Sequence, residues 1–187
     1  MQTISYLWLP ILVAAAFVFI GSTIVWMILP HHKTEWSPAP GQDVIQNAFK
    51  GASPGLYAFP MAQDPKDRRS PEAMKKWQEG PSGHITLVAA GGGMSGMMVK
   101  WVIFNIVVAT FAGYVAGHSF GLGPVGPSWG EVFRVVGAVG FMTYGLSAGA
   151  DAIWFGKPVR SFVLQCADGL FYGALMALAF GWLWPRG

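Results

Sequence analysis

The chain has 187 residues, of which 53% are hydrophobic and only 11% are charged, and its formal net charge is +3. Soluble domains have about 25% charged residues, so this composition indicates a protein that is surrounded by lipid. The single cysteine, Cys166, excludes an internal disulfide bond and a metal site made of cysteines alone.

Four apolar stretches are long enough to cross a bilayer, whose hydrocarbon core of roughly 30 Å requires about 20 helical residues. The first has no basic residue before it and no small-residue cleavage site after it, so we expect a retained anchor and not a signal peptide. The sequence therefore predicts an all-α membrane protein, organised as a single integral membrane domain over residues 1–187. Its predicted transmembrane helices are residues 7–29, 97–117, 132–154 and 162–184.

Basic residues predict the orientation of these helices. Lysine and arginine are concentrated in residues 30–96 and in the short turn between the third and fourth stretches, whereas residues 118–130 contain neither. Cytoplasmic loops of membrane proteins carry an excess of lysine and arginine. We therefore expect residues 30–96 to be cytoplasmic and both termini to lie outside the cytoplasm.

The predicted cytoplasmic segment contains two short amphipathic helices. The sequence GQDVIQNAFKG indicates one helix, with Asp43 as its N-cap and a stop at Gly51. The sequence SPEAMKKWQEG indicates another, with Ser70 as its N-cap and Gly80 at its end. The second helix either lies on an anionic leaflet or is an ordinary solvated helix. Interspersed acidic residues argue against nucleic acid as a partner.

Two aspartates lie within the predicted membrane stretches, and charges at membrane depth often mark functional sites. One hypothesis is a proton- or cation-binding site, and the other, which we favour, is a hydrogen-bonded clamp between the third and fourth helices. Pairing of either aspartate with Lys157 or Arg160 is a further option. The predicted intramembrane polar site comprises Asp151, Asp168, Gln165, Tyr144 and Tyr172.

Small residues recur at helical spacing in the second and third stretches, which allows membrane helices to approach closely. The spacing does not reveal whether the partner helix belongs to this chain or to another subunit. The predicted packing positions are Gly113, Gly117, Gly137, Gly140, Gly145 and Gly149.

Two adjacent histidines, His31 and His32, follow the first stretch, and Glu35 is close by. With His84 in the same predicted compartment they form a secondary hypothesis of metal or haem ligation. Adjacent histidines on a regular helix rarely point to one ion, and we favour an interfacial cap in which the imidazoles meet headgroups and the helix C-terminus. His118 is predicted to lie across the membrane.

The sequence predicts no catalytic residue. Cys166 has no histidine nearby in the sequence that could activate its thiol. No cofactor is predicted, and contacts with membrane lipids are expected. Enzyme activity is therefore not supported by the sequence.

The fragments LWLPILV, MILPHHKTEW, PGLYAFP, GPSGHITL, FRVVG, IWFGKP, DGLFYG and FGWLWP occur in this order along the whole chain. This ordered set resembles a group of small bacterial inner-membrane proteins with four helices and no assigned activity. The resemblance implies a four-helix, multi-pass protein of the bacterial inner membrane, and it transfers no functional residue to this chain. In such a membrane the orientation predicted from the basic residues makes both termini periplasmic.

Two functions follow as hypotheses. We favour a non-catalytic accessory or assembly subunit of a larger membrane complex, with lipids and other membrane subunits, or further copies of the chain, as partners. The alternative is a small proton- or cation-linked transporter or channel that uses Asp151 and Asp168.

Overall fold

The computed structural model describes residues 5–89, 91, 93–121 and 126–185. In this part of the chain, four helical segments are long and apolar enough to cross a membrane, and their boundaries lie within a few residues of the predicted ones. This confirms the prediction of four such helices and supports a multi-pass membrane protein. The segments are Trp8–Ile28, Met94–Phe120, Trp129–Trp154 and Val159–Leu183.

Contacts within the chain divide it into two compact units. The first unit, Met1–Ser37 with Met94–Gly187, contains the four long apolar helices. The second unit, Pro38–Gly93, contains most of the predicted cytoplasmic segment. The organisation of residues 1–187 as a single integral membrane domain stays a prediction.

Two of the long helices contain a wider, π-helical turn. In the first helix the Leu29 amide donates to the Ile24 carbonyl at 3.2 Å, and in the third the Ser147 amide donates to the Met142 carbonyl at 3.1 Å. Each bond spans five residues instead of four, and such turns are frequent at functional sites. The elements of the first unit are α2 (Trp8–Thr23) with η1 (Ile24–Ile28), α5 (Met94–Phe120), α6 (Trp129–Phe141) with η4 (Met142–Leu146) and α7 (Ala148–Trp154), and α8 (Val159–Leu183).

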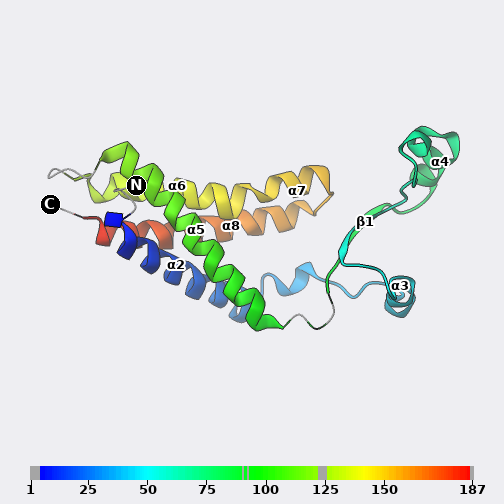
Figure 1. The fold of residues 1–187 in the computed structure, drawn as a ribbon, viewed down its shortest axis with the longest axis horizontal. Coiled ribbons are helices and arrows are strands. Elements are labelled where there is room, and N and C mark those ends of the chain that lie inside the picture. Colours follow the sequence, from blue (N-terminus) through cyan, green and yellow to red (C-terminus); the bar gives the residue numbers. More distant parts are fainter. Residues whose placement is uncertain (1–4, 90, 92, 122–125, 186–187) are drawn as a thin grey trace. The chain divides into compact units, whose positions relative to one another are not determined.

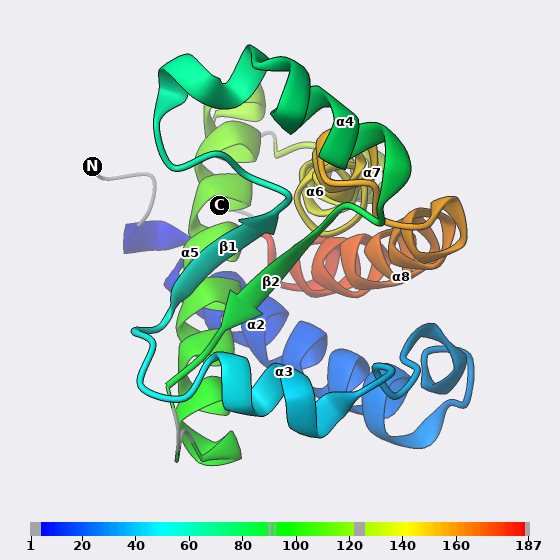
Figure 2. The ribbon, with the colours of Figure 1, turned by 90° about the vertical axis from the view of Figure 1, so that its right-hand side faces the viewer.

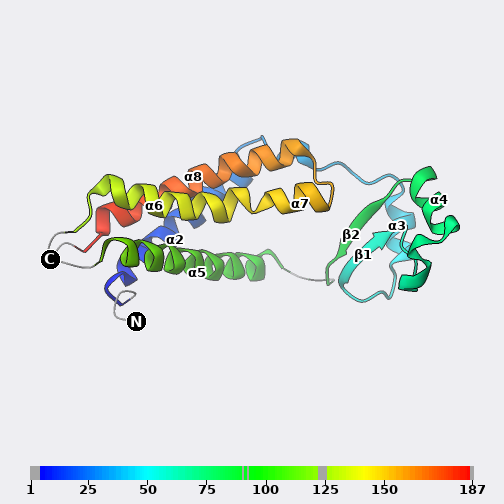
Figure 3. The ribbon, with the colours of Figure 1, turned by 90° about the horizontal axis from the view of Figure 1, so that it is seen from above.

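Helix α8 makes the most extensive contacts in the first unit. It packs along α6 and η4 on one side and along α2 on another, while α5 packs on α2 and α6 (Figure 1). Buried side chains from all four spans, among them Val18, Ala112, Val136 and Phe180, form the core. At the end of the unit where α5 begins, α5 diverges from α7 and α8 (Figure 3).

Glycines allow α8 to approach the third span with backbone in contact with backbone. A Cβ atom at Gly140 would lie 2.6 Å from the Gly173 Cα atom, and one at Gly169 would lie 2.5 Å from the Gly145 Cα atom. Two of these four, Gly169 and Gly173, are absent from the predicted packing set, although they show the same four-residue spacing. Of the other predicted positions, Gly117 is buried on α5, Gly113 faces Phe180, Gly137 faces Ala177 and Gly149 faces Phe162.

The second unit contains the two predicted short helices, α3 (Gln42–Ala48) and α4 (Pro71–Glu79). Ser70 caps α4 as predicted, because its hydroxyl accepts a hydrogen bond from the Ala73 amide at 3.2 Å. The predicted N-cap of α3 is wrong: Gly41 occupies that position with φ of 66°, and Asp43 lies in the first turn. Glycine adopts this left-handed conformation without steric cost.

The second unit also contains a two-stranded antiparallel sheet that the sequence analysis does not predict (Figure 2). Strand β1 (Gly55–Phe59) pairs with β2 (Gly83–Leu87), with Tyr57 opposite Ile85. The fold is therefore helical in its spans and mixed in the segment between the first two spans.

Candidate metal centre

A tight turn follows the first span and positions the adjacent histidines. Proline lacks an amide hydrogen and ends the helix at Pro30. The Lys33 amide then donates to the Pro30 carbonyl at 3.0 Å, and the Glu35 amide donates to the His32 carbonyl at 3.1 Å. His31 and His32 thus lie in a turn and not on a regular helix. Adjacent histidines rarely point to one ion on a regular helix, but this turn directs both rings to the same side.

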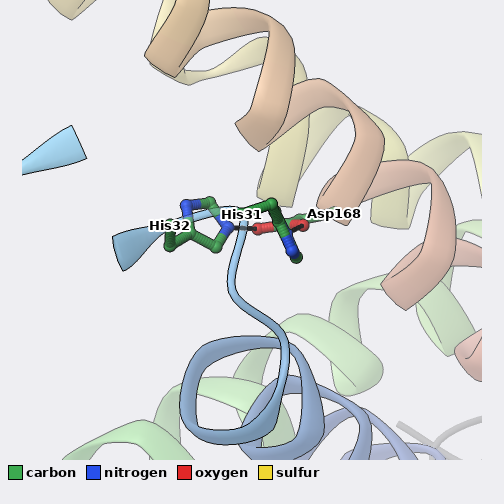
Figure 4. A group of neighbouring side chains, drawn as sticks. All are labelled: His31, His32 and Asp168. Carbon is green, nitrogen blue, oxygen red and sulfur yellow. Dashed lines mark hydrogen bonds and ion pairs between the residues drawn. The ribbon is translucent and has the colours of Figure 1, made fainter. Parts of the chain in front are cut away.

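Both imidazole rings reach the carboxylate of Asp168, which projects from α8 (Figure 4). The Nε2 atom of His32 lies 2.7 Å from Asp168 Oδ2, and the Nε2 atom of His31 lies 3.4 Å from Asp168 Oδ1. One ligand atom from each of the three residues lies within 4.8 Å of the other two. Residues from the end of the first span and from the fourth span therefore form one cluster.

The cluster is largely shielded from solvent and its geometry is fixed by packing. His32 is 3% exposed and Asp168 is 7% exposed, whereas the His31 side chain is 31% exposed. The Trp26 indole stacks on the His32 imidazole, with ring centroids 4.1 Å apart and an interplanar angle of 1°. This stacking restricts rotation of the imidazole and keeps its Nε2 atom directed at Asp168.

The second nitrogen of His32, Nδ1, pairs with the carboxylate of Glu35. Burial raises the pKa of Glu35, but hydrogen bonds from His32 and Ser161 and the charges of His32 and Arg160 lower it more, so this pKa lies below its ordinary value. Glu35 is therefore ionised at neutral pH. His32 therefore has a carboxylate at each of its two ring nitrogens, Glu35 at Nδ1 and Asp168 at Nε2.

The N-terminal end of α8 fixes the outer side of the turn. The Arg160 guanidinium donates to the Thr34 hydroxyl at 2.8 Å and to the His31 carbonyl at 3.5 Å. Arg160 is one of the basic residues predicted to pair with an aspartate, and in the structure it binds the histidine turn instead.

The donor set fits a divalent transition-metal ion. Ligands that surround such an ion tetrahedrally at about 2.1 Å lie about 3.4 Å from each other. His31 Nε2 has this separation from Asp168 Oδ1, at 3.4 Å, whereas His32 Nε2 lies 2.7 Å from the other oxygen, Oδ2. The side chains must therefore adjust for one oxygen and both nitrogens to bind the same ion. Two imidazoles and one carboxylate leave a fourth position for water or another ligand.

The pairing of His32 with Glu35 adds a second feature of metal sites. Imidazoles that bind a metal commonly donate their other N–H to a carboxylate, which fixes the tautomer and makes the ligand more basic. A haem fits less well, because bis-histidine ligation places the imidazoles on opposite faces of the macrocycle. Here the two ring centroids are only 4.3 Å apart.

Four of the five residues of the predicted intramembrane polar site line one cavity of about 560 Å³: Asp168, Gln165, Tyr144 and Tyr172. The fifth, Asp151, is exposed near the end of α7, where its backbone carbonyl accepts from the Phe155 and Lys157 amides. Lys157 donates through Nζ to Gln165 at 3.3 Å. A joint site of Asp151 and Asp168 stays a prediction.

The sequence analysis places His31, His32 and Asp168 in separate hypotheses, and the structure brings them together. The third histidine of the metal hypothesis, His84, lies in β2 of the second unit, opposite Ala58. One signal in the sequence pointed to the cluster: a carboxylate at membrane depth needs a partner. Imidazoles at the end of a neighbouring span can supply one.

Fold and cluster together define the class of the protein as a helical protein with four potential membrane spans and a histidine–aspartate cluster at one end of its bundle. No family model, curated protein or solved structure matches the chain. The resemblance to small bacterial inner-membrane proteins accordingly stays a prediction.

Proposed function

We propose that this protein is a membrane protein that binds one divalent transition-metal ion through His31, His32 and Asp168. The observation that carries this proposal is the convergence of the three side chains, from segments 136 residues apart, on one cluster in which His32 and Asp168 are buried and His31 is partly exposed. Imidazole and carboxylate ligands suit Zn²⁺, Fe²⁺, Co²⁺ and Ni²⁺. The class of ion, and not one particular metal, is what the donor set supports.

A purely structural clamp is the competing interpretation. A buried carboxylate requires a hydrogen-bonded partner, and His32 alone at 2.7 Å meets that requirement. The clamp does not require His31 to share the same carboxylate, nor Glu35 to pair with the far nitrogen of His32. A metal site uses both features, since it needs several ligands and a fixed tautomer.

The test is an equilibrium titration of the purified, chelator-treated protein with Zn²⁺ in the presence of a competing dye. We expect one high-affinity ion per chain. Loss of a direct ligand should cost more than the 10–100-fold typical of residues that only support a ligand, so Asp168→Ala should weaken binding by at least about 100-fold. Asp151→Asn changes an exposed aspartate of the preceding span and should bind like the wild type. Equal affinity of Asp168→Ala and wild type would refute the proposal.

Cation-linked transport is a second proposal, and one observation favours it. Asp168 contacts the two histidines and is also one of the residues that line the cavity between the spans, so its side chain connects the cluster with the cavity. Flux of Zn²⁺ into proteoliposomes, lost in Asp168→Asn and retained in Asp151→Asn, would support transport through Asp168. Flux that needs both aspartates would support the pathway predicted from the sequence.

A role as an accessory or assembly subunit also remains a proposal. The glycines of the third span, which suggested partner helices, lie against α8 of the same chain. The surface of α5 and of the third span is largely uncovered within the chain, and this supports contacts with partner subunits. Mild extraction from native membranes followed by mass spectrometry distinguishes constant partner subunits from lipid on this surface.

A further inference from the structure

A cavity adjoins the histidine–aspartate cluster. Asp168 belongs to both, and Trp26, which stacks on His32, also lines the cavity. Residues from all four spans form its wall, and its volume of about 560 Å³ lies within the roughly 300–1,000 Å³ range of pockets that bind ligands. Neither His31 nor His32 is among the described residues that line it. The cavity can therefore hold a ligand of its own beside the cluster.

Four of the nine methionines of the chain line this one cavity. Met94, Met97 and Met98 lie on α5 at positions i, i+3 and i+4, which share one face of a helix. Met27 lies in η1 at the end of the first span. Methionines from two separate spans therefore border the same space.

Three of these methionines do not fill a core within the chain. Methionine commonly occupies irregular gaps between buried side chains, as the fully buried Met176 does here. In contrast, Met27 is 57% exposed, Met94 is 66% exposed and Met97 is 61% exposed. An apolar surface of this kind does not require sulfur, because leucine has nearly the same volume and similar hydrophobicity. The thioether itself is therefore the feature that needs a reason.

The chemistry of the wall suits a soft cation. A thioether sulfur is neutral and polarizable, and among metal ions it selects Cu(I). The described residues around the cavity include the carboxylate of Asp168 but neither lysine nor arginine, so the charge of the wall favours a cation. Trp26 and Trp101 also line it, and the face of an indole attracts cations. The Trp101 indole N–H donates to the Ser22 hydroxyl at 2.8 Å, which holds that ring in place.

We propose that this cavity is a second metal site, which binds one Cu(I) ion through the thioether sulfurs of Met27, Met94, Met97 and Met98. The three rotatable bonds of each methionine side chain let the sulfurs close on the ion. This inference does not rest on the proposed site for a divalent ion, because its ligands are sulfur atoms and not the imidazoles of His31 and His32.

The test is an anaerobic titration of the purified protein with Cu(I) in competition with bicinchoninate, whose Cu(I) complex is coloured. All proteins carry Cys166→Ala, which removes the only thiol. We expect one Cu(I) ion per chain. Leucine keeps the volume of methionine and lacks the sulfur, so Met97→Leu/Met98→Leu should retain the fold and weaken Cu(I) binding by at least about 100-fold. Met142→Leu, at an exposed methionine of η4 outside the cavity wall, should bind like the parent protein.

Two further variants keep the test decisive. Met27→Leu removes a sulfur from the first span and should weaken binding by about 10-fold or more, which shows that both spans hold the ion. His31→Ala/His32→Ala should retain Cu(I) affinity while it loses Zn²⁺, so failure of one metal proposal is distinguishable from failure of the other. Equal Cu(I) affinity of the parent and both leucine variants would overturn the proposal. Loss of Cu(I) only in the double histidine variant would overturn it too, because copper would then belong to the histidine cluster.

Discussion

The Nε2 atom of His32 lies 2.7 Å from Oδ2 of Asp168, and this contact ties the end of the first span to the N-terminal half of the fourth. The same imidazole is stacked under Trp26 and pairs through its other nitrogen with Glu35. One buried histidine thus connects two carboxylates, and most of the expected properties of the site depend on it.

Replacing His32 should destabilise the metal-free protein much more than replacing His31. His32→Ala leaves the buried Asp168 with only the more distant His31, and loss of one member of a buried pair costs about 3–5 kcal/mol. His31→Ala retains the shorter contact and should cost about 1 kcal/mol. Thermal unfolding in detergent measures both, with the exposed His118→Ala as control. Equal effects of the two substitutions would contradict the assigned geometry.

Glu35→Gln should weaken metal binding and leave the fold intact. The amide keeps the size of the side chain but loses the negative charge that pairs with Nδ1 of His32. Nδ1 is the ring nitrogen that does not face Asp168. Residues in this supporting position typically contribute 10–100-fold to metal affinity. Glu72→Gln, in an exposed pair with Lys76 on α4, is the matched control. Wild-type Zn²⁺ affinity in Glu35→Gln would show that Glu35 does not act through His32.

Gly169→Ala should disrupt the contact between α8 and the third span. The added Cβ atom would lie 2.5 Å from the Cα and N atoms of Gly145, and backbone cannot move aside as a side chain can. Overpacking of this kind costs about 1–3 kcal/mol or more. Gly96→Ala, where a Cβ atom meets nothing within 4 Å, should be neutral or slightly stabilising. Unfolding by sodium dodecyl sulfate compares the stability of the two variants. Unfolding at similar detergent concentrations would refute the close backbone contact assigned to Gly169.

Both termini should lie on the opposite side of the membrane from residues 38–93. In the first unit the N-terminal end of α2 and the C-terminal end of α8 lie together, away from the histidine turn (Figure 1). The other end of the unit carries basic residues: Lys33 follows the first span, and Lys157 and Arg160 lie at the turn between the third and fourth spans. Their excess predicts a cytoplasmic location for that end. Alkaline phosphatase fused after Gly187 should be active in a bacterial host. Activity only when the enzyme is inserted in residues 38–93 would reverse the orientation.

The sequence was sufficient to predict the spans because a bilayer requires a long, continuous apolar stretch, and such a stretch is a local property. It was also sufficient for α4, since Ser70 and Pro71 are local helix-start signals. The sheet was missed because residues 60–82 separate β1 from β2, and strands of five residues have little signal of their own. Long-range pairing of this kind is not encoded in spacing.

The cluster was missed for a related reason. His32 and Asp168 are 136 residues apart, so no local motif joins them. The geometry of the adjacent histidines depended on Pro30, which ends the helix and allows both rings to turn toward α8. Treating the pair as part of a regular helix therefore led the sequence analysis to favour an interfacial cap over ligation.

X-ray absorption at the metal edge of the Zn²⁺-loaded protein tests the central claim most directly, because imidazole ligands give a characteristic multiple-scattering signal. The account predicts two imidazoles and at least one oxygen ligand in the wild type, and loss of the imidazole signal in the double variant His31→Ala/His32→Ala. A spectrum without imidazole, or one that is unchanged in the double variant, would contradict metal binding by His31, His32 and Asp168.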